Sequence, residues 1–201
     1  MMIQRIRSVA FLTAVGMCSV LWSGCANQPV VTSNNGNSAP RAETAKPPSD
    51  RGDRVVTGGD LDFMNQAAMG SLAEVELGRL ALNQAASADV KGFAQQMIDD
   101  HSKAAGQLKQ LAQGKNVMLP LEISPSHKQT MEKLTNLKGA EFDREYVKAM
   151  VEDHVKDVTA FGAVAQNATD ADVKAFAAKT LPTLQEHLQM IRGIAAKLDV
   201  R

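Results

Sequence analysis

From residue 60 onward, apolar residues recur at spacings of three and four positions, the pattern of one face of an α-helix. Four long stretches show this pattern, at residues 60–84, 89–111, 141–166 and 171–198. No stretch alternates apolar and polar residues as a half-buried strand would. The chain is therefore expected to be all-α, with four long helices.

The four predicted helices form two copies of one unit. The phrase DVKGFA at residues 89–94 returns as DVKAFA at residues 172–177, an offset of 83 positions. A connection of about thirty residues, with a short helix predicted at residues 126–137, separates the second long helix from the third. Two repeated helical hairpins joined by a long crossover are typical of a ferritin-like four-helix bundle.

Ionisable residues interrupt the apolar faces of all four long helices. His101 and His154 each end a similar phrase, MIDDH and MVEDH. Counted from the hairpin turns at 1.5 Å per residue, five ionisable residues lie within a turn or two of the same height: Glu74, His101, His154, Asp157 and His187. Buried ionisable groups are costly unless they are paired or bound to a metal, so this cluster requires an explanation.

Two explanations fit the cluster. In the first, a hydrogen-bonded network of imidazoles and carboxylates fixes the register of the helices. In the second, one transition metal (Zn, Fe, Mn or Cu) is bound by imidazole and carboxylate ligands on facing helices. The candidate ligands are the three histidines, His101, His154 and His187, together with Glu74 or Asp157.

The surrounding residues narrow the kind of metal site. A methionine lies one helical turn from each histidine, at residues 97, 150 and 190, and thioether ligands would favour Cu(I). Methionine also fills gaps in ordinary cores. A dinuclear carboxylate centre is disfavoured, because Ile98 and Leu184 stand where the Glu-x-x-His motif needs a glutamate.

Charge and motifs exclude several classes of function. The chain has 22 basic and 22 acidic residues, so nothing in its net charge favours nucleic acid as a partner. No glycine-rich phosphate loop follows a strand, and no nucleophile, base and orienting group are assembled. His127, in the crossover, is expected to be a solvated loop or capping residue.

The amino terminus resembles a bacterial lipoprotein signal. Arg5 and Arg7 precede an apolar run at residues 9–21, and small residues precede Cys25. We expect a signal peptide at residues 1–24, a lipid-anchored flexible linker at 25–59 and the bundle at 60–198. Cys25 would then attach the protein to the outer membrane of a Gram-negative host; an ordinary secretory signal or an uncleaved anchor is the alternative.

Several phrases together resemble the DUF4142 family of bacterial envelope proteins. They are the segment from Asp62 to Glu76, the phrase FAQQMIDDH ending at His101, the phrase FDREYV at residues 142–147 that leads to His154, and LPxLxxH ending at His187. The resemblance covers about residues 60–198. It implies an exported, ferritin-like helical bundle with no established activity.

Two hypotheses about function remain open. The sequence favours a non-enzymatic binding or envelope-maintenance module, tethered to the membrane, whose histidine and carboxylate cluster is structural. The second hypothesis is a periplasmic metal-binding or metal-dependent redox protein with a mononuclear site of three histidines and a carboxylate. The sequence identifies no protein partner.

Overall fold

The computed structural model describes Val56 and residues 58–200, which fold into five helices. They are α1 (Gly59–Gln84), α2 (Ala88–Gly114), α3 (Pro125–Thr135), α4 (Gly139–Asn167) and α5 (Ala171–Lys197). No strand occurs among the described residues, which confirms the prediction of an all-α fold. The expected signal peptide and Cys25, and the expected linker except for Val56, Gly58 and Gly59, lie outside these residues.

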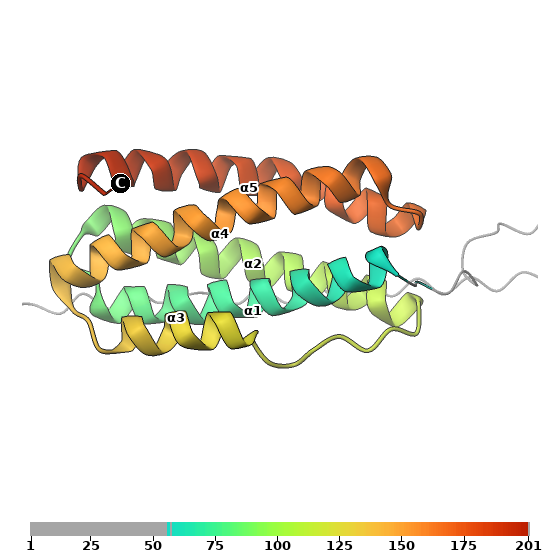
Figure 1. Cartoon of the computed structure of the whole chain (residues 1–201), viewed down its shortest axis with the longest axis horizontal. Coiled ribbons are helices and arrows are strands. Elements are labelled where there is room, and N and C mark those ends of the chain that lie inside the picture. The colour runs from blue at the N-terminus through green and yellow to red at the C-terminus, as the bar shows by residue number, and fades with distance from the viewer. Residues whose placement is uncertain (1–55, 57, 201) are drawn as a thin grey trace, which may run out of the picture. The chain divides into compact units, whose positions relative to one another are not determined.

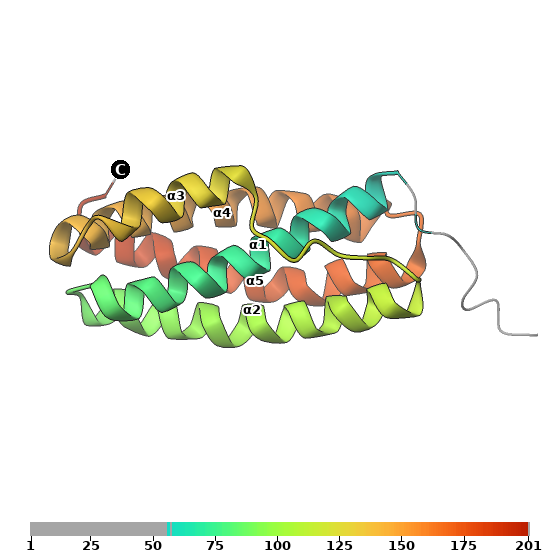
Figure 2. The same ribbon diagram turned by 90° about the horizontal axis from the view of Figure 1, so that it is seen from below.

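The long helices pack as two antiparallel hairpins, α1 with α2 and α4 with α5 (Figure 1). The segment between α2 and α4 runs back along the bundle, and its helix α3 packs against α1 and α4 (Figure 2). Across the hairpins, α1 packs against α4 and α2 against α5. The crossover predicted from the length of this connection is therefore present.

The internal repeat is visible in the helix boundaries and in their caps. Adding 83 to the bounds of α2 gives the bounds of α5. At one end of the bundle, Asp143 accepts hydrogen bonds from the backbone N–H groups of Ala86 and Ser87, at 3.1 and 2.9 Å. At the other end, Asp60 accepts one from the N–H of Asp170, at 2.7 Å. Asp60 and Asp143 are 83 residues apart, as are Ser87 and Asp170, so equivalent carboxylates join the two hairpins at both ends.

The apolar core is divided into two clusters along the bundle. One surrounds the turn between α1 and α2 and includes Leu77, Phe93 and Tyr146. The other lies toward the turn between α4 and α5 and includes Phe63 and Phe161. A layer of buried polar residues lies between them.

Two features of these helices concern membrane crossing and an internal proline. No helix in the described part of the chain is long and apolar enough to cross a bilayer. Pro182 lies inside α5, which continues through it as one helix. Proline has no N–H for the carbonyl four residues before it, so the turn at Ala178 lacks one helical hydrogen bond.

Candidate metal centre

Four helices each contribute one side chain to the polar layer at mid-bundle. Glu74 comes from α1, His101 from α2, His154 from α4 and His187 from α5. Their exposed fractions are 1%, 5%, 0% and 0%, so the layer is closed to bulk water. Each of the four residues occupies a position on the apolar face of its helix, as set by the 3.6-residue period. All four therefore face the inside of the bundle.

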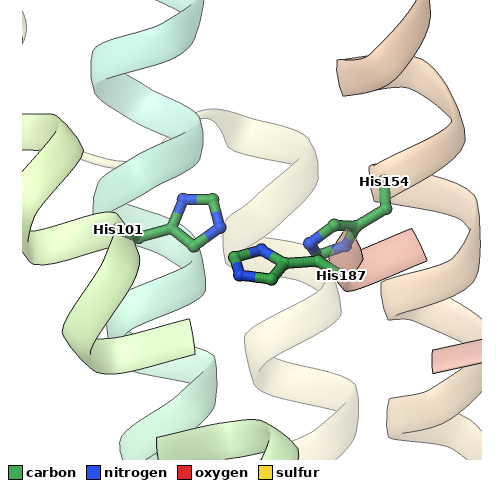
Figure 3. A group of neighbouring side chains, drawn as sticks. All are labelled: His101, His154 and His187. Carbon is green, nitrogen blue, oxygen red and sulfur yellow. The ribbon is translucent and has the colours of Figure 1, made fainter. Parts of the chain in front are cut away.

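The three imidazoles converge on one point (Figure 3). One ring nitrogen from each of His101, His154 and His187 lies within 4.8 Å of the other two. The ring centroids are 5.5 to 6.0 Å apart, and the rings are tilted or edge-on rather than stacked. The three rings therefore bring one nitrogen each close together without stacking on one another.

Glu74 joins this group from the side of α1. Its Oε2 lies 2.5 Å from His101 Nε2, and its Oε1 lies 3.4 Å from His154 Nδ1. Burial opposes ionisation of this carboxyl group, but the charges of His101 and His154 lower its pKa to about 2. Burial likewise opposes the charged form of His101, and the charge of Glu74 outweighs it and raises the His101 pKa. Without metal, the lowered pKa of Glu74 and the raised pKa of His101 both favour an ion pair between them.

The outer nitrogens of two histidines are already bonded. The Nδ1 of His154 lies 2.9 Å from the carbonyl oxygen of Met150, and the Nε2 of His187 lies 2.9 Å from Asp100 Oδ2. Each of these nitrogens therefore carries the proton and donates it. The other nitrogens, His154 Nε2 and His187 Nδ1, are buried and have no hydrogen-bond partner. Buried lone pairs of this kind are rare unless something binds them.

The fit to a metal ion follows from this donor set. Neutral imidazoles whose second nitrogen donates to a carbonyl or carboxylate are the usual form of metal-binding histidines. Three imidazoles and one carboxylate match the ligand types of Zn²⁺ and of other first-row divalent ions. The unpartnered nitrogens, His154 Nε2 and His187 Nδ1, would gain a partner. These residues are therefore suited to hold one such ion.

Asp157, the other carboxylate proposed from the sequence, lies beside this group and not within it. Among the described residues, no ion pair joins it to a histidine. It lines a small cavity of about 10 Å³ together with His101, Ser71 and Thr180. Burial, and then the charge of Glu74, raises the Asp157 pKa to about 7.

The three methionines near the histidines differ in their exposure to solvent, which the sequence did not show. Met97 and Met150 are fully buried, whereas Met190 is 37% exposed. Met190 therefore faces outward on α5, and a thioether for each histidine is not available.

Three residues around the layer have roles that the sequence analysis missed. Asp100 holds His187, and Asp153 lies 3.4 Å from His127 on α3. His127 also contacts Ser124 Oγ, at 2.9 Å. The repeated Asp-His dipeptide was the available signal, since each aspartate precedes a central histidine and pairs with a histidine on another helix.

Comparison with known proteins identifies a family and a fold. The family model described as "Domain of unknown function (DUF4142)" matches residues 45–194. No curated protein matches the chain. A DUF305 fragment from Deinococcus radiodurans superposes with a TM-score of 0.62 at 14% identity, covering 72% of this chain and 99% of its own.

The copper protein CopM has a similar fold. Its Cu(II)-bound form gives a TM-score of 0.59 at 15% identity, covering 69% of this chain and 96% of CopM. Its Cu(I)-bound form gives 0.60 at 14% identity, covering 70% and 98%. At these identities the likeness establishes the fold alone.

Proposed function

This chain belongs to the DUF4142 family, which has no assigned function, and we propose that it is an exported helical-bundle protein that binds one transition-metal ion. The ligands in this proposal are His101, His154, His187 and Glu74. The bundle itself is proposed to be of the ferritin-like class, since its crossover joins two repeated hairpins.

One observation carries the proposal. Two buried imidazole nitrogens, His154 Nε2 and His187 Nδ1, have no partner, while the second nitrogen of each ring is fixed by a hydrogen bond. A purely structural network would satisfy its buried groups, because an unsatisfied one costs about 1–3 kcal/mol. A bound metal ion removes that cost for both nitrogens at once.

The metal is proposed to be copper or zinc. Nitrogen and oxygen ligands bind Cu²⁺ most tightly of the first-row divalent ions, followed by ions such as Zn²⁺. CopM, which has a similar fold, has structures in copper-bound forms. This supports the proposal that a bundle of this kind can bind copper. Iron and manganese, which the sequence also left open, are expected to bind more weakly.

Metal analysis of the protein, purified from the periplasm without chelator or affinity tag, tests the proposal. We expect about one metal ion per chain in the parent and none in a His101→Ala/His154→Ala variant that circular dichroism shows to be helical. His187→Asn, which keeps a polar group beside Asp100, serves if the double variant does not fold. His127→Asn, which changes the histidine outside the cluster, is expected to retain the metal. A parent that neither contains nor takes up metal would contradict the proposal.

A non-enzymatic structural role for the cluster is the second candidate. The ion pair of Glu74 with His101 favours it, because this contact exists without any metal. Under this reading His101→Leu combined with Glu74→Leu would leave a stable bundle, since replacing a buried ion pair with apolar groups is often neutral. The same metal analysis separates the two candidates.

Export and membrane attachment are proposed from the amino-terminal sequence. Cys25 would carry the lipid, residues 25–59 would act as the tether, and the bundle would lie in the periplasm, attached to the outer membrane of a Gram-negative host. Cys25→Ser is expected to move the protein from the membrane fraction to the soluble periplasmic fraction. Unchanged membrane association of this variant would argue against lipid attachment at Cys25.

A further inference from the structure

The fourth histidine of the chain, His127, lies outside the metal centre and contacts an aspartate of α4. His127 Nε2 lies 3.4 Å from Asp153 Oδ2, and the two side chains are 19% and 18% exposed. The hydrogen bond to Asp153 raises the His127 pKa, and the more distant charges of Glu74 and Asp157 act in the same direction. The crossover helix α3 thus brings an imidazole and a carboxylate together where solvent reaches them.

Asp157 lies one helical turn beyond Asp153, beside the cavity that His101 also lines. It follows Asp153 by four residues on α4, so both carboxylates lie on the same face of that helix. Asp157 is only partly exposed and lines the 10 Å³ cavity beside His101, a volume that fits about one water-sized particle. The side chain of His127 is 19% exposed, whereas that of His101 is 6% exposed.

The repeat explains why this cavity lies next to the metal centre. Shifting the positions of the centre by 83 residues replaces Glu74 by Asp157, His101 by Leu184, His154 by Ser71 and His187 by Ala104. All four replacements line the cavity. The cavity is therefore the counterpart of the metal centre in the other half of the repeat, with the carboxylate kept and small or apolar side chains in place of the imidazoles.

From this arrangement we infer that His127, Asp153 and Asp157 form an uptake route along which a divalent transition-metal ion passes from solvent, through the cavity, to the His101–Glu74 side of the metal centre. The inference rests on the proposed function of that centre. His127, Asp153 and Asp157 each offer an oxygen or nitrogen ligand. No one of these positions offers the four ligands that would hold the ion in place.

Other approaches to the centre are less suited to a cation. Phe93 packs edge-on against His154 and His187, with ring centroids at 5.9 and 6.3 Å, and covers the centre from within the core. Asp100 reaches the surface between α2 and α5, but Lys103 and Lys179 line the depression there. Lys156, 3.5 Å from Asp153, places positive charge at the entrance of the proposed route as well, so the route is preferred for the cavity that leads to His101.

Stopped-flow measurement of Cu(II) binding to the chelator-stripped full protein tests the route. The visible absorption of the copper–imidazole centre reports binding, and equilibrium titration first establishes the stoichiometry. His127→Asn is expected to slow association by about tenfold, while one copper ion per chain is still bound at equilibrium. Because the ion leaves by the same route, dissociation should slow by a similar factor, and the affinity should stay nearly unchanged.

Glu122→Gln is the matched control. Glu122 lies on the same crossover and pairs with Lys128, and both side chains are exposed, at 79% and 56%, so solvent screens their charges and the loss of Glu122 should leave the association rate within about twofold of the parent. One bound copper with unchanged rates in His127→Asn, or a parent rate independent of copper concentration, would overturn the route alone. No copper binding by the parent at equilibrium would overturn the proposed function and the route with it.

Discussion

Saturating the chelator-stripped protein with Zn(II) or Cu(II) is expected to raise its thermal unfolding midpoint by about 10 °C. An ion present at about a thousand times its dissociation constant stabilises the folded state by roughly 4 kcal/mol, and a protein of this size gains about 2–4 °C per kcal/mol. The ion would bind the folded chain far better than the unfolded one, because the four ligands meet only when four helices pack. Differential scanning calorimetry with and without the ion measures the shift.

The shift should also grow with pH. The charge of Glu74 raises the pKa of His101 despite burial, so part of the metal-free protein carries an imidazolium there, and the ion must displace that proton. Raising the pH from 6 to 8 weakens this competition and should therefore enlarge the shift. The His101→Ala/His154→Ala variant should show no shift at either pH. A parent midpoint unaffected by either metal would leave the cluster as a structural network.

The fold could be read from the sequence because its signals are local and repeated. The apolar stripes predicted all four long helices to within a few residues, and Ser87 and Asp170 cap α2 and α5 as short polar side chains at these positions do. The offset of 83 residues predicted two equivalent hairpins, and the carboxylates of Asp60 and Asp143 make equivalent contacts. Pro182 does not end α5, because the packing of the helix holds it together across one lost hydrogen bond.

Only part of the candidate site could be predicted from the sequence. Helical spacing brought Glu74 and the three histidines to one level, but spacing cannot say which neighbouring aspartate turns toward which partner. Asp100 lies next to His101 in the chain and yet bonds to His187 on α5. His127 was predicted to be a solvated loop or capping residue. Its contact with Asp153 could not be predicted, because the course of the crossover depends on long-range packing of α3, which no periodicity encodes.

The equivalent carboxylates of the two halves of the repeat have different surroundings. Glu74 and Asp157 occupy equivalent positions, but only Glu74 has imidazole partners. The pKa of Glu74 is therefore lowered to about 2, whereas burial raises that of Asp157 to about 7. One carboxylate stabilises the metal-free fold at neutral pH and the other destabilises it.

Asp157→Asn is therefore expected to stabilise the metal-free protein above pH 7. Burial, with the charge of Glu74, favours the protonated form of Asp157 in the folded state, so its contribution to stability is complete below pH 3.8 and is lost as the pH rises to about 7. Asparagine does not ionise and avoids that loss. After allowing for partial solvent contact, the variant should gain about 1–3 kcal/mol in unfolding free energy at pH 8 and little at pH 4. Urea unfolding at both pH values measures the difference.

Asp153→Asn, one turn earlier on α4, is the control for this effect. Asp153 is ion-paired with His127 and Lys156, so removing its charge should leave stability unchanged or lower it at pH 8. A bound metal ion should abolish the advantage of Asp157→Asn, because its positive charge stabilises the nearby carboxylate. An Asp157→Asn variant no more stable than the parent at pH 8 would contradict the raised pKa. A gain in stability together with slower copper uptake would show that Asp157 is kept for the passage of metal at a cost to the fold.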